Sequence, residues 1–195
     1  MTTTRKTLLQ RVRDHSDREA WEQFFELYAP ILEGYARAHG LSRSDAEEVR
    51  DRCLEVVARR MPAFEYARER GRFKAWLLKI ARGKVVDFLR RPGERAGEPG
   101  ALVALEGTDP GPDAHWERHW RAEHLRHCLR EVRRSEAEHT YRVFELLLVE
   151  ELSVPEVCEK TGLNANQVYK AKARVLRRVR EALERLGAGE DALGE

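Results

Sequence analysis

Residues 153–178 read SVPEVCEKTGLNANQVYKAKARVLRR, and this spacing is that of a helix–turn–helix. Ser153 followed by Pro155 predicts the start of a short first helix, which ends at Gly162. A glycine suits the turn, because the chain must enter a left-handed conformation there that a Cβ penalises. Leu163 supplies the apolar plug of the turn. The stretch therefore predicts two helices joined by a short turn, and the second helix can enter the major groove of DNA.

The second helix of the motif is expected to have Asn164 as its N-cap and Val168 as its anchor. Its outward side carries amides and cations, which can donate hydrogen bonds to base edges and to phosphates. The residues expected to contact duplex DNA are Asn164, Asn166, Gln167, Lys170, Lys172, Arg174, Arg177 and Arg178. An ordinary helical hairpin with a basic flank is the alternative, and the glycine, the plug and the amides together favour DNA binding.

A break in composition divides the chain upstream of this motif. Residues 92–112 hold four of the seven prolines and five of the thirteen glycines, a composition typical of linkers. On both sides of the break apolar residues recur at three- and four-residue steps, and no stretch alternates as a strand would. The sequence thus predicts an all-α chain with helical modules at 1–91 and 113–186, joined by a flexible linker at 92–112 and followed by a disordered tail at 187–195.

The overall composition agrees with a helical protein that has a charged exterior. Charged residues make up 36% of the 195 residues, the apolar set 42% and aromatics 8%, which does not favour a β-sandwich. No stretch approaches the roughly 20 apolar residues of a membrane span. The first residues lack an apolar secretion core, so we expect a cytoplasmic protein that binds no membrane. Three widely spaced cysteines predict no disulfide framework.

Positive charge is concentrated in two segments, although the net charge is only +2. Residues 66–91 hold nine basic and two acidic side chains, and residues 170–180 hold six basic and no acidic ones. These segments fit two contact surfaces for a polyanion, with two solvated helix faces as the alternative. In the first segment aromatic rings stand among the cations, which suits single-stranded nucleic acid. The alternative there is that Phe73 and Trp76 are core residues at helical spacing.

Histidines gather on the helix predicted to begin near residue 113. The pairs His115/His119 and His124/Cys128 have a four-residue spacing that can chelate a metal. No Cys-x-x-Cys pair or acid triad completes a site, and neighbouring arginines repel a cation, so we expect no metal and no cofactor. The sequence also lacks a Gly-rich phosphate loop and a His-Glu-x-x-His motif, so we expect no enzyme. A metal-dependent hydrolase that uses these histidines is the enzymatic alternative.

Three further stretches carry a family resemblance. They read DAEEV at 45–49, RGRFKAWLLKIAR at 70–82 and VDFLRR at 86–91. These stretches resemble region 2 of bacterial sigma-70-family factors of the extracytoplasmic-function type. The helix–turn–helix at 152–180 resembles region 4 of the same family. The motifs occur in the family's order over most of the chain, with a short linker and no intervening third domain.

The resemblance implies a subunit that binds core RNA polymerase, recognises the −35 and −10 promoter elements and helps to melt DNA. It implies that the helix–turn–helix residues named above read the −35 element as duplex. Residues that it assigns to the −10 element and to melting are Arg72, Phe73, Lys74, Trp76, Lys79, Arg82, Lys84, Asp87, Arg90 and Arg91. Residues that it assigns to polymerase docking are Asp45, Glu48, Val49, Asp51, Arg52 and Glu55. An anti-sigma factor is a further partner that it implies.

The chain departs from the family pattern at two points. Where the docking helix usually carries a Gln followed by an acid, this chain has Asp51 and Arg52, which bears on polymerase affinity. Where the −10 helix often carries an Asn, this chain has Gly83, which removes a contact and destabilises a helix by roughly 1 kcal/mol relative to alanine. The alternative function is a free-standing helix–turn–helix transcriptional regulator, whose first module binds a protein other than polymerase.

Overall fold

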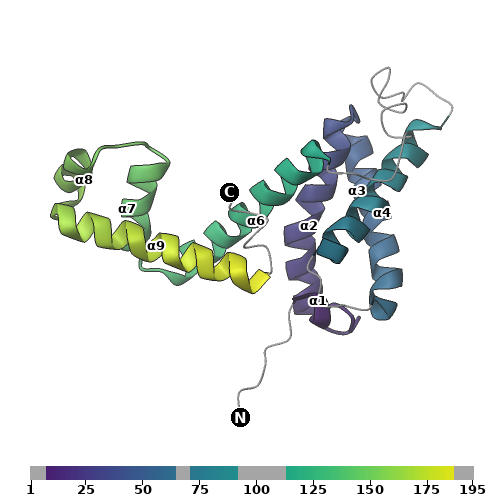
Figure 1. The fold of residues 1–195 in the computed structure, drawn as a ribbon, viewed down its shortest axis with the longest axis horizontal. Coiled ribbons are helices and arrows are strands. Elements are labelled where there is room, and N and C mark those ends of the chain that lie inside the picture. Colours follow the sequence, from purple (N-terminus) through teal and green to yellow (C-terminus); the bar gives the residue numbers. More distant parts are fainter. Residues whose placement is uncertain (1–7, 65–70, 92–112, 187–195) are drawn as a thin grey trace, which may run out of the picture. The chain divides into compact units, whose positions relative to one another are not determined.

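The computed structural model describes residues 8–64, 71–91 and 113–186 (Figure 1). Every regular element in these residues is a helix, which confirms the predicted all-α class. The linker predicted at 92–112 and the tail predicted at 187–195 lie outside the described residues.

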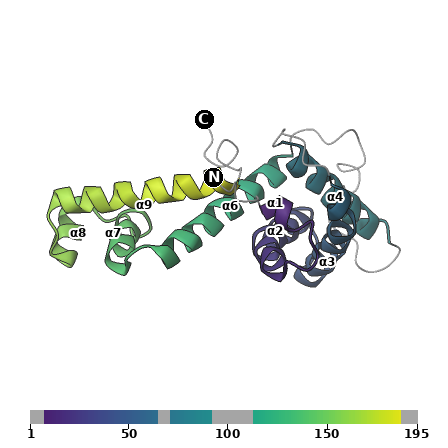
Figure 2. The same ribbon diagram turned by 90° about the horizontal axis from the view of Figure 1, so that it is seen from below.

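The chain divides into two compact units, residues 1–123 and 124–195, and each is described by itself. The first unit is a bundle in which α2, α3 and α4 pack side by side (Figures 1 and 2). Its elements are α1 (Leu8–Arg11), α2 (Arg18–Ala38), α3 (Arg43–Arg60), the 3-10 helix η1 (Met61–Ala63), α4 (Gly71–Leu89) and the opening turns of α6 (Ala114–Ser135).

The core of the first unit is made by the apolar stripes that the three- and four-residue spacing predicts. Burial of each large apolar side chain contributes about 1.5–3 kcal/mol relative to leaving it exposed. Nearly fully buried members of these stripes are Phe24, Ile31 and Leu32 of α2, Val49, Cys53 and Val57 of α3, and Leu77, Val85 and Phe88 of α4.

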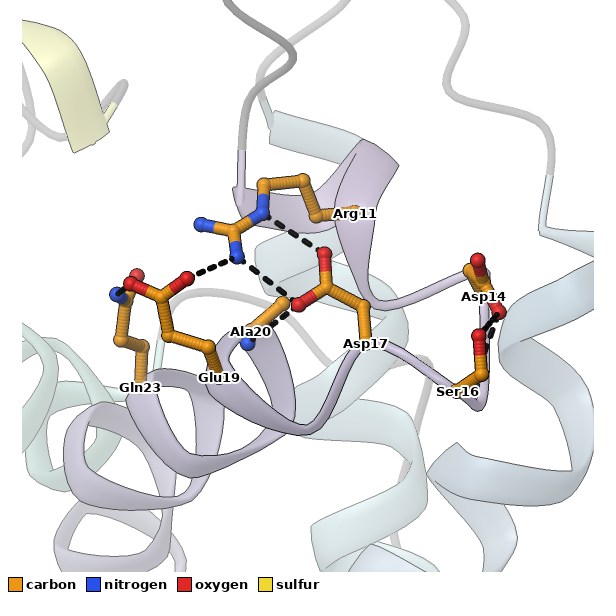
Figure 3. A network of polar contacts seen from close by, with 7 residues as sticks. All are labelled: Arg11, Asp14, Ser16, Asp17, Glu19, Ala20 and Gln23. Atoms are coloured by element: carbon orange, nitrogen blue, oxygen red, sulfur yellow. Dashed lines mark hydrogen bonds and ion pairs between the residues drawn. The ribbon is translucent and has the colours of Figure 1, made fainter.

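A polar network fixes the start of α2 (Figure 3). Asp17 is the N-cap, and its Oδ1 accepts a hydrogen bond from Ala20 N at 3.0 Å. Arg11 donates to both carboxylate oxygens of Asp17 at 2.9 Å and to Glu19 at 2.9 Å. The hydrogen bonds from Arg11 lower the pKa of Asp17. The stabilisation from this cap is therefore present above the unfolded-state pKa and is lost as the pH falls through the lowered, folded-state value.

The start of α3 is fixed by a serine cap. Ser42 is the N-cap, and its Oγ accepts a hydrogen bond from Asp45 N at 3.2 Å. Before it, α2 ends at Ala38, and Gly40 adopts a φ of +83° that favours glycine. Local sequence is thus sufficient to place the turn between α2 and α3.

The opening turns of α6 pack into the first unit, although the sequence predicted that the second module begins at residue 113. Trp116 is fully buried, with its ring centroid 5.4 Å from that of Tyr35. The Trp120 ring lies 5.6 Å from Tyr28 and 6.4 Å from Phe73. The boundary between the compact units consequently falls inside α6, after residue 123, because these two tryptophans complete the aromatic core.

Close approach of α6 to α2 depends on a glycine. A Cβ added at Gly34 would stand 2.5 Å from His119 Nδ1, so the two helices leave no room for a side chain there. Asp113 begins the helix by accepting hydrogen bonds from the backbone of His115 and Trp116 at 2.9 and 3.0 Å. Its other oxygen accepts from the Tyr35 hydroxyl at 3.0 Å, which holds the start of α6 on α2.

The second unit contains the rest of α6, α7 (Glu138–Leu148), α8 (Val154–Thr161) and α9 (Ala165–Leu186). Helices α7 and α8 lie on the same side of α9 (Figure 2). One apolar cluster joins α6 and α7 to the C-terminal half of α9 through Val175, Val179 and Leu183. A second cluster joins α7 and α8 to the start of α9 through Val168. Both clusters lie along one side of α9, so its other side is left to solvent.

Candidate nucleic-acid interface

The helix–turn–helix of the second unit forms at the predicted residues. Ser153 caps α8 in a reciprocal capping box, in which Glu156 Oε2 accepts from Ser153 N at 2.8 Å. The helix ends at Gly162, whose φ of +71° lies in the left-handed region. Leu163 packs into the apolar cluster shared by α7, α8 and α9, as expected of a plug in the turn. The turn that presents α9 is therefore fixed by local sequence.

Two of the expected DNA-contacting amides form the cap of α9. Asn164 Oδ1 accepts from Gln167 N at 3.0 Å, and Gln167 Oε1 accepts from Asn164 N at 2.9 Å. Bidentate recognition of adenine needs both the oxygen and the nitrogen of such an amide. Because the cap uses one lone pair of each oxygen, it fixes the orientation of Asn164 and Gln167 and leaves their amino groups and a second lone pair for other contacts.

The outward side of α9 carries the remaining amide and most of the cations. Asn166, Lys170 and Arg177 are exposed, and Lys172 is half-buried. The three exposed residues lie on the side opposite the buried valines, whereas Lys172 lies beside the buried stripe. Helical spacing places Asn166, Lys170 and Arg177 along one strip of the surface, where they can reach a groove together.

Sequence reasoning missed two exposed apolar side chains on α9. Tyr169 is 57% exposed and Leu176 is 41% exposed. Their seven-residue separation puts them on one flank of the helix, next to the outward cations. The signal in the sequence is that neither residue falls on the stripe formed by Val168, Val175 and Val179.

The other two duplex-binding candidates bind a buried acid. Arg174 Nε donates to Glu136 Oε2 at 2.8 Å, and Arg178 Nε lies 3.4 Å from Glu136 Oε1. The side chain of Glu136 is 1% exposed, whereas those of Arg174 and Arg178 are 60% and 42% exposed. Sequence reasoning missed Glu136, because nothing near it in the chain indicates that it meets α9.

In the first unit, Phe73 lies in the core rather than on a surface that could stack bases. Its side chain is 3% exposed, and its ring centroid lies 5.2 Å from Tyr28 and 5.7 Å from Trp76. The alternative reading of Phe73 as a core residue at helical spacing therefore describes its place in the fold. Trp76 is only half-buried and packs against Phe64 at 4.8 Å, so part of its ring reaches the surface.

Lys74 is also occupied within the first unit. Its Nζ lies 2.8 Å from Glu117 Oε2 and 5.6 Å from the ring centroid of Trp120. With its side chain only 12% exposed, this lysine holds α6 on α4. The aromatic and basic pattern of α4 is thus used in part to bind another helix of the same unit.

Two cations near the end of α4 have acidic partners as well. Lys84 Nζ lies 3.3 Å from Asp87 Oδ2, one turn along the helix. Arg91 Nη1 lies 2.9 Å from Glu48 Oε1 of α3, and its guanidinium lies 5.1 Å from the Phe88 ring centroid. These pairs are exposed or partly exposed, so each contributes little to stability.

The outward side of α4 retains part of the set assigned to the −10 element. Lys79 and Arg90 are exposed, and Arg82 is half-buried. Gly83 stands among them, and a Cβ added there would meet nothing within 4 Å. Arg72 belongs to the helix, but its side chain lies outside the described residues.

The residues assigned to polymerase docking all belong to α3, and all but one of them reach its surface. Val49 is 1% exposed, so its side chain belongs to the core and contributes nothing to a surface. Asp45 takes part in the N-terminal cap, where its Oδ2 accepts from Ser42 Oγ at 2.6 Å. Glu55 is exposed and pairs with Arg59 at 2.9 Å.

The two residues of α3 that depart from the family pattern, Asp51 and Arg52, take part in ion pairs. Asp51, whose side chain is 62% exposed, lies 2.8 Å from Arg50 Nε. Arg52 lies 2.5 Å from Glu48 Oε1, the atom that also binds Arg91, which follows the end of α4. The charges of Asp51 and Arg52 are therefore neutralised by ion pairs at the surface of the first unit.

Neither a metal-binding cluster nor a membrane-spanning helix occurs among the residues that the structure describes. Within them no group of three or more His, Cys, Asp or Glu side chains could hold a metal ion. The histidines of α6 are separated by the fold: His119 packs against Gly34 in the first unit, and His124 is buried in the second. The hydrolase alternative gains no support there. In the same residues, no helix has the length and apolar character needed to cross a membrane.

Comparison with known proteins agrees with this arrangement. Residues 24–95 match the family described as Sigma-70 region 2, a range that covers α3, α4 and most of α2. The chain is 28% identical over 179 residues to the ECF RNA polymerase sigma factor RpoE of Cereibacter sphaeroides, an alignment that covers 92% of this chain and 91% of that protein. These comparisons support the resemblance found in the sequence motifs: residues 24–95 match Sigma-70 region 2, and the chain is similar over most of its length to an ECF RNA polymerase sigma factor.

Proposed function

We propose that this chain binds core RNA polymerase, recognises −35 and −10 promoter elements and promotes transcription initiation. The observation that carries the proposal is the exposed, cationic outward side of α9, presented by a capped helix–turn–helix in a chain similar to a sigma factor of this type. The chain acts as a specificity subunit with no catalysis of its own, in the cytoplasm, on polymerase and promoter DNA. An anti-sigma factor is included as a proposed regulatory partner.

Recognition of the −35 element is assigned to α9 in the major groove. Asn166 lies in its first turn, which in this motif contacts base edges, and Lys170 one turn later is assigned to a neighbouring phosphate. Arg177 lies further along the same exposed strip and is assigned to the phosphate backbone. Exposed Tyr169 supplies an apolar surface suited to the methyl group of thymine.

Engagement of the −10 element is assigned to the outward side of α4. Trp76 and Phe64 form a partly exposed aromatic pair, on which an unstacked base can pack. Lys79 and Arg90 supply exposed positive charge for the backbone of the same strand. Phe73 and Lys74 are left out of the contact set, because the fold of the first unit already uses them.

Docking on polymerase is assigned to the exposed charges of α3. Glu48, Asp51, Arg52 and Glu55 stand on its surface as paired acids and bases. A protein surface with complementary charges can replace these ion pairs within α3 by ion pairs across the interface. Such contacts favour one docking orientation more than they raise affinity.

Reconstitution with core polymerase tests the proposal. We expect the chain to co-purify with core polymerase at low salt and to start transcription at discrete sites in a pool of genomic fragments. A Lys170→Ala, Arg177→Ala double variant should still co-purify but lose those start sites, because its change is confined to α9. Failure to co-purify, with DNA binding retained, would instead support the free-standing regulator, whose first module binds another protein.

A further inference from the structure

Glu136 makes an unusual set of contacts in the second unit. It lies between α6 and α7, and its carboxylate holds two arginines of α9 that are one helical turn apart. Oε2 accepts from Arg174 Nε at 2.8 Å, and Oε1 lies 3.4 Å from Arg178 Nε. The neighbouring Ser135 Oγ accepts from Arg178 Nη2 at 3.3 Å. One buried carboxylate thus orients two guanidinium groups side by side.

The geometry leaves donors of both arginines for another ligand. A guanidinium has five N–H donors, and Glu136 engages each group through Nε. Within the described residues the printed contact of Arg174 uses Nε, so its two terminal nitrogens are not engaged, and the side chain is 60% exposed. Two arginines and one carboxylate also leave a local charge of about +1, so an anion is still attracted.

We propose that Arg174 and Arg178 form a binding site for one backbone phosphate of duplex DNA, and that Glu136 is its positioning residue. The inference rests on the function proposed above and narrows the duplex contact that the sequence suggested for these arginines to a single phosphate. Helical spacing puts them on a flank of α9, about a quarter turn from Asn166 and Lys170. Arginine side chains held on that flank face a groove wall, where the phosphates are, rather than the base edges.

Pre-ordering explains why a negative charge is useful beside DNA. A flexible arginine loses rotamer entropy when it binds, and a residue that already holds it reduces this loss. Planar guanidinium groups held in place also match two phosphate oxygens at once. Glu136 thereby lowers the positive charge of the site, but it holds both guanidinium groups in a fixed orientation for the phosphate.

Neutralising Glu136 separates positioning from simple electrostatics, because the two predict opposite signs. If Glu136 acts only as a negative charge near DNA, Glu136→Gln raises affinity for duplex promoter DNA. If Glu136 positions the arginines, the same change lowers affinity, by up to about tenfold for one charge-assisted hydrogen bond. Glu131→Gln is the matched control, since Glu131 also joins α6 to α9 through Arg185 but lies on the exposed surface.

The experiment measures binding of the full chain, reconstituted with core polymerase, to a promoter duplex in which single phosphates are replaced by neutral methylphosphonates. For the wild type, we expect one replacement near the −35 element to weaken binding. Glu136→Gln and Arg174→Lys should be weaker on the natural duplex and insensitive to that replacement, whereas Glu131→Gln behaves as wild type. Lysine keeps a cation for Glu136, so Arg174→Lys should fold with nearly unchanged thermal unfolding.

Three results would overturn the inference. They are higher affinity of Glu136→Gln, full methylphosphonate sensitivity of Arg174→Lys, and coupling of Arg174 to a base substitution in place of a phosphate. In each case the wild type still binds the promoter, so the proposed function stands. A wild-type complex that prefers no promoter fragment contradicts the proposed function itself and is distinguishable from the other results.

Discussion

The two basic segments of this chain have similar excesses of positive charge, but their side chains have different surroundings in the folded protein. In α4, Lys74 and Lys84 bind acids of the first unit. In α9, Lys170 and Lys172 have no ion-pair partner in the part of the chain that the structure describes. A count of basic residues therefore overestimates the positive charge that each helix can offer to a polyanion, and the overestimate is larger for α4 than for α9.

Packing explains the difference between the two helices. Helix α9 buries a single stripe of valines and alanines, so its remaining sides are free to carry charge to solvent. Helix α4 is covered on more than one side, because α3 and the opening turns of α6 both contact it. Its aromatic residues and part of its cations are consequently needed for the fold of the first unit.

The largest expected effect tests whether α4 is built into a core closed by α6. Trp116→Ala should lower the free energy of unfolding by about 3–5 kcal/mol, since it removes a fully buried ring beside Tyr35. Chemical denaturation, with hydrogen exchange in α2 and α4 as the local readout, measures it. Trp76→Ala is the control and should be milder because Trp76 is half-buried. If both substitutions lowered the free energy of unfolding equally, the buried contact of α6 would stabilise the first unit no more than a half-buried side chain of α4 does.

A smaller effect concerns the charges themselves. Lys170→Ala should weaken binding to duplex promoter DNA by about tenfold and reduce the slope of log affinity against log salt by about 0.9, as expected for one lost phosphate contact. Lys84→Ala, a matched lysine that already binds Asp87, should leave the slope for duplex DNA unchanged. Salt titrations of both variants by fluorescence anisotropy compare the two segments directly. A change of slope in Lys84→Ala alone would reverse the comparison.

Features set by neighbouring residues were predictable from the sequence, whereas contacts between distant helices were not. Ser153 begins α8 and Gly162 ends it as expected, because capping depends on residues three or four positions away. The burial of Trp116 against α2 and the contact of Glu136 with α9 join residues that no spacing rule connects. At such long-range contacts the surface available to nucleic acid differs most from the one that the sequence predicted.

The outward side of α4 is tested by adding a side chain at Gly83. Gly83→Ala should stabilise the first unit by roughly 1 kcal/mol, since the new Cβ meets no atom within 4 Å. If this side of α4 contacts the −10 element closely, promoter opening should fall although the protein is more stable. Permanganate reactivity of promoter thymines measures the opening, and thermal unfolding measures the stability. Greater stability with unchanged opening would leave α9 as the single tested DNA contact.

The smallest effect separates base contacts from backbone contacts on α9. Exposed Tyr169 lies beside the outward cations, and an apolar group there gains about 0.8 kcal/mol from covering one methyl group. Replacing one thymine of the −35 element by deoxyuridine should therefore weaken wild-type binding by about threefold to fourfold. Tyr169→Ala should bind both duplexes equally, because the partner of the methyl group is already missing. Since deoxyuridine leaves every phosphate in place, Lys170→Ala must stay sensitive to it. A loss of sensitivity in Lys170→Ala would mean that this lysine also sets the position of Tyr169, and the two kinds of contact on α9 would then not be separable.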